Sequence, residues 1–143
     1  MTALEAAIKA KLTTSPDWTA LVTGGTSLYE DLGINGLMPD NALYDMDGNM
    51  KLTAVLTFGT SSEAEILNSE TEFFTLWLYH GTSFAAIKQA RTLAKSLLNM
   101  KQVATDDAGY PLIRWVNNLA DFQAAELNNA FAGGSRYLLK FTR

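Results

Sequence analysis

The segment Thr71–His80 constrains the fold of this chain more than any other stretch of its sequence. As a strand, it would present Phe73 and Trp77 on one face and Phe74 and Leu76 on the other. A strand with one solvated face alternates apolar and polar residues, whereas a strand covered on both faces is apolar throughout. We therefore expect this segment to be a central strand that is covered on both sides.

Other strands are predicted on both sides of this segment. Residues 50–58 are rich in Thr, Val, Leu and Phe and predict a strand. The dipeptide Asp47-Gly48 before it predicts a hairpin turn. Residues 112–122 begin as a strand with Ile113 and Trp115 on one face, whereas residues 118–132 fit either a helix or a strand. Residues 136–142 alternate, with Tyr137, Leu139 and Phe141 facing one way and Arg136, Lys140 and Thr142 the other.

Three helices are expected. Leu4, Ile8 and Leu12 recur every fourth residue and predict an amphipathic helix over Ala3–Thr13. The sequence Ser15-Pro16-Asp17 starts a second, short helix, because serine caps helices and proline favours their first position. A third helix should follow Thr82 or Ser83 and continue to Asn99. Its expected buried stripe is Phe84, Ile87, Ala90, Leu93, Ala94, Leu97 and Leu98.

These elements predict an α+β fold, an antiparallel β-sheet flanked by α-helices in a single domain over residues 1–143. The length of 143 residues fits one domain, and 48% hydrophobic with 18% charged residues is ordinary for a globular chain. The N-terminus lacks the pattern of a secretory signal, and the apolar run 73–79 is too short for a membrane helix. We expect no membrane partner.

Charge and composition exclude several classes of function. The net charge of −4 and the lack of a basic patch argue against a nucleic-acid-binding protein. Lys88, Arg91 and Lys95 share one helix face, which is interpreted as solvated surface, with a contact to DNA or an acidic partner as the alternative. The absence of cysteine excludes thiol catalysis and disulfides.

No motif predicts catalysis, a cofactor or a metal. Residues 81–85 resemble a hydrolase nucleophile elbow, but the only histidine, His80, lies upstream, so Ser83 is interpreted as a helix cap. Asp45 and Asp47 resemble the start of a calcium loop whose glycine is misplaced, and we expect a plain turn. Asp106 and Asp107 lack a third ligand nearby. Trp77 and Trp115 are interpreted as core residues rather than base-stacking platforms.

Residues 59–69 form a predicted loop that is longer than a hairpin needs. The loop carries Glu63 and Glu65 with Ile66 and Leu67 beside them. An apolar pair with acidic neighbours suits the centre and rim of a protein interface. We predict a partner interface at these four residues, with an inert hairpin tip as the alternative.

The order of parts resembles the tail terminator, or tail completion, proteins of long-tailed bacteriophages. The resemblance covers nearly the whole chain. It is carried by Trp18-Thr-Ala-Leu-Val-Thr-Gly-Gly, Leu28-Tyr-Glu, Leu52-Thr-Ala-Val-Leu-Thr-Phe, Glu72-Phe-Phe-Thr-Leu-Trp-Leu-Tyr, the helix with Ile87, Ala90, Leu93 and Leu97, and Arg136-Tyr-Leu-Leu-Lys-Phe-Thr.

The resemblance implies a non-enzymatic virion protein at the head–tail junction, assembled in the host cytoplasm. Such a protein forms a homohexameric ring that caps the tail tube, stops its polymerisation and joins it to the head–tail connector protein. The implied partners are therefore other copies of the chain, the tail tube protein and the connector. DNA would pass through the ring without specific binding, repelled by its acidic inner wall. The alternatives are another neck or tail-tube component, or a non-phage small-molecule or peptide-binding domain.

Overall fold

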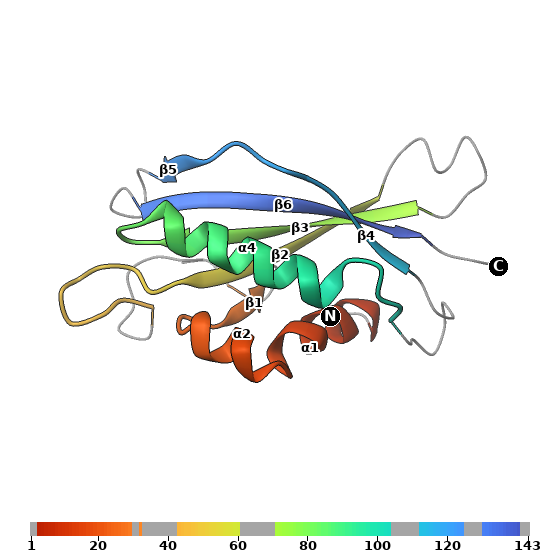
Figure 1. The fold of residues 1–143 in the computed structure, drawn as a ribbon, viewed down its shortest axis with the longest axis horizontal. Helices are drawn as coiled ribbons and strands as arrows, with labels where there is room; N and C mark the ends of the chain where they lie inside the picture. The colour runs from red at the N-terminus through yellow and green to blue at the C-terminus, as the bar shows by residue number, and fades with distance from the viewer. Residues whose placement is uncertain are drawn as a thin grey trace.

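The computed structural model describes residues 3–29, 32, 43–60, 71–103, 112–124 and 130–140. Helices lie near both the start and the middle of the chain, with strands between and after them (Figure 1). The elements are α1 (Ala3–Thr13), α2 (Pro16–Leu21), β1 (Thr26–Leu28), β2 (Thr53–Thr60), β3 (Thr71–His80), α4 (Phe84–Leu98), β4 (Leu112–Asn118), β5 (Phe122–Ala124) and β6 (Ala130–Lys140).

The helix starts follow the capping rules that the sequence predicts. The Ser15 side chain accepts a hydrogen bond from the backbone N–H of Trp18, and Pro16 occupies the first turn of α2. Ser83 caps α4 by accepting from the backbone N–H of Ala85 at 3.0 Å. Ser83 is therefore a helix cap as expected, and α1 has the predicted bounds.

All strands join one sheet in the order β1-β2-β3-β6-β4, and β5 pairs with the first residues of β6. The pairs β2–β3, β3–β6, β4–β6 and β5–β6 are antiparallel as predicted. β1 was not predicted, and it runs parallel to β2. The parallel pairing is possible because residues 29–52 supply the long crossover that parallel neighbours require. The sheet is thus mixed rather than wholly antiparallel.

The ambiguous segment 118–132 contains strand at both of its described ends. β5 begins at Phe122, and β6 begins at Ala130, six residues before the predicted start at Arg136. The alanine-rich spacing left the start of β6 unpredicted, because alanine favours helices. Pairing of β6 with β3 from Phe131 to Lys140 determines the outcome instead.

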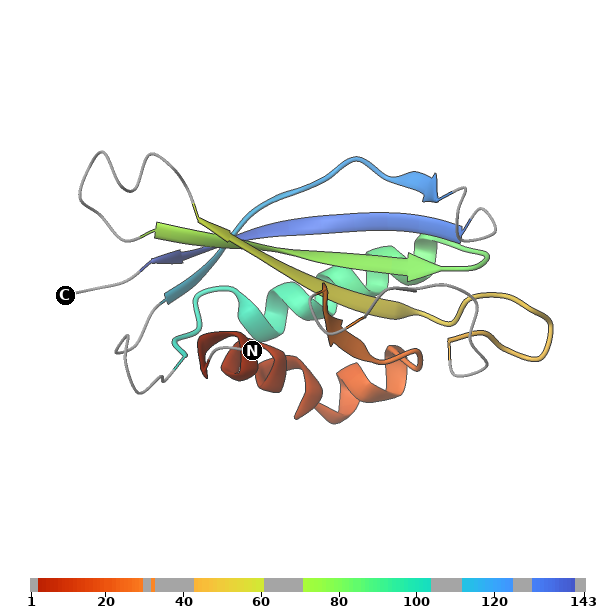
Figure 2. The same ribbon diagram turned by 180° about the vertical axis from the view of Figure 1, so that it is seen from behind.

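The helices pack on one face of the sheet. Figures 1 and 2 place α1, α2 and α4 on the same side of the sheet. Residues of these helices share one hydrophobic core cluster with the side chains of β3 that alternate with Phe73. Phe74, Leu76 and Leu78 have no exposed surface, nor have Tyr137 and Leu139 of β6. Burying a leucine or phenylalanine completely stabilises a fold by about 1.5–3 kcal/mol. This layer is the main core, and the expected α+β class is confirmed.

The opposite face of β3 is less covered than the sequence predicts. β3 is central, but no helix of the described residues lies on its Phe73 and Trp77 side, and both side chains are half-buried. The Trp77 ring instead packs edge-on against the Phe122 ring, with 6.0 Å between the two ring centroids. Gly134 leaves room for the Trp77 ring, because a Cβ there would lie 2.8 Å from its Cε3 atom. The apolar pattern of this face therefore reflects aromatic packing within the sheet.

Candidate assembly interface

The predicted interface loop joins β2 to β3. β2 continues to Thr60, so the residues between the paired strands are 61–70 rather than 59–69. Gly59 and Thr60 pair with Phe73 and Glu72. Glu63, Glu65, Ile66 and Leu67 lie outside the described residues, as do Asp106 and Asp107.

The acidic turn before β2 is a hairpin, which we call the tip hairpin (residues 43–50). Tyr44 and Met50 form an antiparallel bridge across it. Asp45 Oδ1 accepts hydrogen bonds from the backbone N–H groups of Asp47 and Asn49, both at 2.9 Å. Gly48 has a φ of 80°, a conformation that favours glycine. The carboxylate of Asp45 therefore shapes the hairpin turn that the sequence predicts.

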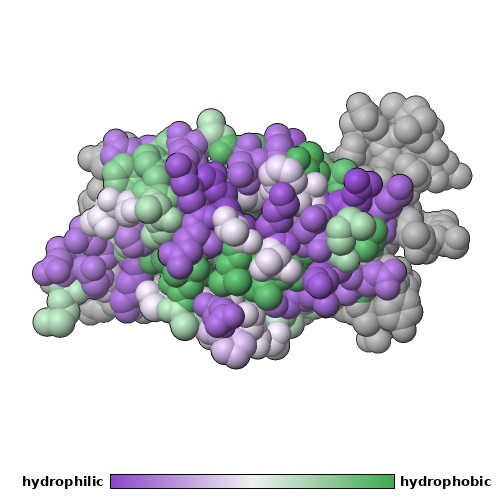
Figure 3. All heavy atoms as spheres, viewed as in Figure 1, coloured by the Kyte–Doolittle hydropathy of each residue, from purple (hydrophilic) through white to green (hydrophobic). Residues whose placement is uncertain are grey.

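The tip hairpin projects from one end of the molecule, as the orange-yellow segment in Figures 1 and 2 shows. Met46 at its turn is 103% exposed, the largest exposed fraction among the large hydrophobic residues that the structure describes. Figure 3 shows the surface at this end as largely hydrophilic. A single exposed apolar side chain is ordinary at a protein surface, so Met46 indicates docking only together with the carboxylates of Asp45 and Asp47 beside it.

His80 has a structural role that the sequence did not reveal. The backbone N–H groups of Thr82 and Ser83 donate to its Nδ1 atom at 3.2 and 3.1 Å. Burial lowers the pKa of His80, although the nearby carboxylate of Asp45 opposes that shift. The neutral ring thus closes the turn between β3 and α4.

The prediction that Lys88, Arg91 and Lys95 form a solvated face of α4 is wrong for Arg91. Arg91 is buried, and its Nη1 atom lies 2.9 Å from Oδ1 of Asp121. Lys88 and Lys95 are exposed, with Lys95 Nζ 3.9 Å from the centre of the Trp115 ring. Arg91 lies on the core side because the Ile87–Ala94 stripe of the helix includes its position. The row is therefore not a basic surface, and Trp115 is partly buried against the core as expected.

A basic surface occurs elsewhere, on the sheet face away from the helices, and corrects the prediction that the chain has no basic patch. Arg136, Leu138 and Lys140 alternate along β6, and Arg114 of β4 lies opposite Leu138. All three cations are exposed, whereas Leu138 is half-buried. The Arg136 guanidinium lies 5.3 Å from the centre of the Phe73 ring. We call these five residues the basic sheet face.

The alternation of residues 136–142 separates Arg136 and Lys140 from the core side of the last strand but does not connect them with Arg114. Their proximity depends on the register of β4 against β6, including the shift between Trp115 and Asn117. No local pattern encodes a pairing of strands so far apart in sequence. Arg136 and Lys140 are exposed, whereas Tyr137 and Leu139 are buried, as predicted.

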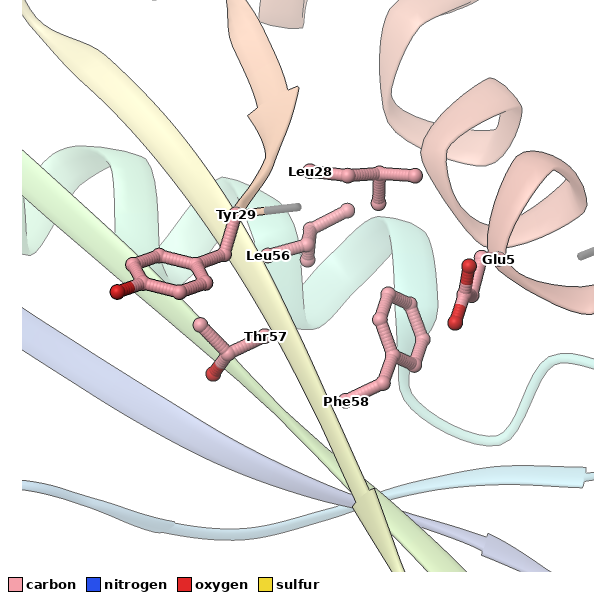
Figure 4. Close-up of a pocket in the computed structure, with 6 residues that line it drawn as sticks. All are labelled: Glu5, Leu28, Tyr29, Leu56, Thr57 and Phe58. Atoms are coloured by element: carbon pink, nitrogen blue, oxygen red, sulfur yellow. The ribbon is translucent and has the colours of Figure 1, made fainter. Parts of the chain in front are cut away.

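A small pocket lies between α1, the edge strand β1 and its neighbour β2 (Figure 4). Its volume is about 60 Å³, and Glu5 of α1 faces Phe58 across it, with the exposed Tyr29 at its rim. Pockets for small-molecule ligands usually measure about 300–1,000 Å³. This pocket is therefore too small to hold a cofactor.

No cluster of three or more histidine, aspartate or glutamate side chains with metal-binding geometry occurs among the residues that the structure describes. No helix in that part of the chain is both long and apolar enough to cross a lipid bilayer.

Comparisons with known proteins give a likeness of fold. No protein-family model matches the sequence, and no curated protein matches it. Among solved structures, the chain is similar to a chain from the structure described as "Virion of native gene transfer agent (GTA) particle". The identity is 12% and the TM-score is 0.65, over 97% of this chain and 94% of that chain. The likeness extends over essentially the full length of both chains, so this fold also occurs in a component of a virion.

Proposed function

We propose that this chain is a structural protein of a phage-type virion, and more specifically a tail terminator. Copies of the chain would form a homohexameric ring on the last ring of the tail tube. The ring would stop polymerisation of the tube and offer its other side to the head–tail connector. The chain would act by assembly, without catalysis or a cofactor, at the head–tail junction of particles assembled in the host cytoplasm.

The full-length likeness to a chain of a gene transfer agent virion carries this proposal. Similarity over 97% and 94% of the two chains means that the whole domain corresponds, rather than one motif within it. The resemblance of the sequence layout to tail terminators is independent of that comparison and narrows the role.

Docking to the tube or the connector is proposed for residues 61–70 between β2 and β3. Glu63 and Glu65 would form a polar rim around Ile66 and Leu67. β2 and β3 pair from Thr53 with Tyr79 to Thr60 with Glu72, and the core residues of both strands lie outside the segment that joins them. This segment can therefore vary without changing the core.

The central experiment measures stoichiometry and tail length together. Native mass spectrometry of the chain and class averages of isolated tails should give six-fold particles. A chain that is monomeric both in solution and on tails contradicts the proposal. Tubes that continue to grow with this chain as their repeating subunit would identify a tail-tube component instead.

The docking segment is tested by replacing residues 61–70 with a short turn. The expected product is a folded ring that leaves tails overlong or unable to join heads. A matched control replaces the exposed Lys88 with alanine, away from the segment. Tails of normal length and infectious particles from the shortened chain would show that the segment is an inert tip.

A further inference from the structure

The basic sheet face has positive charge without a partner in the described part of the chain. Arg114, Arg136 and Lys140 are exposed and form no ion pair there, while the pair that does form uses Arg91 and Asp121. Leu138 lies between them on the same face. The Phe73 ring beside the Arg136 guanidinium adds an aromatic surface. Three cations around an apolar centre suit an acidic partner that also presents one apolar side chain.

The tip hairpin has that composition. Asp47 is exposed and forms no ion pair within the described residues, and Met46 beside it is 103% exposed. Asp45 contributes a second carboxylate, with its Oδ1 atom already bound to the turn. Methionine is flexible and polarizable, so it packs well against an aliphatic and aromatic surface.

The two surfaces lie at opposite ends of the molecule. In Figures 1 and 2 the tip hairpin projects from one end of the long axis, and β6 reaches its last residues toward the other end, where the chain terminus is marked. The continuous sheet between them prevents their meeting within one copy. Surfaces that differ and lie at opposite ends produce head-to-tail contacts, which form a ring when the rotation between copies closes and an open filament when it does not.

We propose that the tip hairpin of one copy docks on the basic sheet face of the next copy. Met46 packs between Leu138 and Phe73, while Asp45 and Asp47 lie among the three cations. Repetition of this contact supplies the joints of the ring. The inference rests on the ring of the proposed function and names the surfaces that build it.

The test reverses one charge on each side of the contact. Arg136→Glu and Asp47→Lys should each weaken self-association about tenfold or more, because like charges then face each other. An equimolar mixture of the two variants should assemble again. In an alternating ring, the two substituted side chains meet at one joint with their charges exchanged, and the two native side chains meet at the next. Sedimentation velocity over a wide concentration range, with native mass spectrometry, measures both effects.

Matched controls separate local charge from net charge. Lys88→Glu and Asp17→Lys change the same charges at exposed positions outside both surfaces and should leave assembly unchanged. Met46→Ser should weaken assembly while leaving the melting temperature of the dilute chain unaltered, because Met46 is fully exposed.

The outcomes distinguish this inference from the proposed function. A wild-type chain that never assembles, free or on tails, overturns both. A wild-type ring that Arg136→Glu and Asp47→Lys leave intact overturns only the docking inference, as does a mixture that fails to reassemble. If the wild-type chain instead binds duplex DNA below about 10⁻⁶ M and Arg136→Glu abolishes that binding alone, the basic sheet face is a DNA surface and the inference is wrong.

Discussion

Removal of the Asp121 carboxylate should destabilise the fold more than removal of its partner Arg91. The two groups are 2.9 Å apart, and the pair ties α4 to the segment that precedes β5. The Arg91 side chain is 9% exposed, whereas the Asp121 side chain is 29% exposed. In Asp121→Ala the guanidinium keeps its charge in a site that water barely reaches. In Arg91→Met the carboxylate still has access to water.

The structure sets the expected magnitudes. Two unit charges at this separation attract by about 6 kcal/mol at an effective dielectric constant near 20, and desolvation offsets much of that attraction. Breaking a buried pair from one side costs about 3–5 kcal/mol. We expect about 3 kcal/mol for Asp121→Ala, at the lower end because that carboxylate is partly hydrated, and about 1.5 kcal/mol for Arg91→Met. The double variant should cost about 1.5 kcal/mol, since no unpaired charge is left buried.

Urea unfolding at one fixed protein concentration measures these free energies. The concentration must be fixed because assembly would add its own stabilisation. The slopes of the four unfolding curves should agree, so that differences in midpoint report stability. The reasoning is refuted if Asp121→Ala lies within about 0.5 kcal/mol of wild type, or if the two single costs add in the double variant.

Three other substitutions test separate features of the fold. Tyr137→Phe should raise the free energy of unfolding by about 1 kcal/mol, because the buried Tyr137 hydroxyl has no hydrogen-bond partner among the residues that the structure describes; a loss of stability in thermal unfolding would contradict this. Gly134→Ala should cost about 1–3 kcal/mol, because its Cβ would lie 2.8 Å from the Trp77 ring, and quenching of tryptophan fluorescence should change with it. His80 has a lowered pKa in the folded state, so the unfolded chain binds its proton first as the pH falls. The contribution of His80 is therefore complete above about pH 6.5 and is lost as the pH falls through the folded-state pKa. His80→Gln should flatten the melting temperature between about pH 7 and pH 5, and an unchanged pH profile would show that the ring does not titrate with folding.

Local sequence rules were sufficient for the elements with strong local patterns. The caps at Ser15 and Ser83 determine where α2 and α4 begin, and the period of Leu4, Ile8 and Leu12 determines the inward side of α1. β3 has the predicted bounds because both of its parities are apolar. Each of these features depends on residues within a few positions of one another.

The features that the sequence did not predict share a different cause. They depend on contacts between segments that are distant in the sequence. β1 is only three residues long and is specified by its parallel register with β2. Arg91 was predicted to be a solvated cation, because its partner Asp121 comes from another segment of the chain. Gly133 and Gly134 are required where α4 and Trp77 approach β6, and glycine in a strand gives no indication of which side needs the space.

The distribution of charge over the surface also depends on contacts between distant segments, and this distribution affects assembly. A net charge of −4 describes the whole chain and not its surfaces. The sheet register gathers Arg114, Arg136 and Lys140 on one face, while the tip hairpin holds Asp45 and Asp47 at the other end of the molecule. A chain with this polarity repels copies of itself in most orientations because its total charge is negative. It attracts them in the head-to-tail orientation, where unlike surfaces meet. Negative overall charge thus favours one ordered contact over nonspecific association, and raising the salt concentration should weaken that contact more than it weakens the folded subunit.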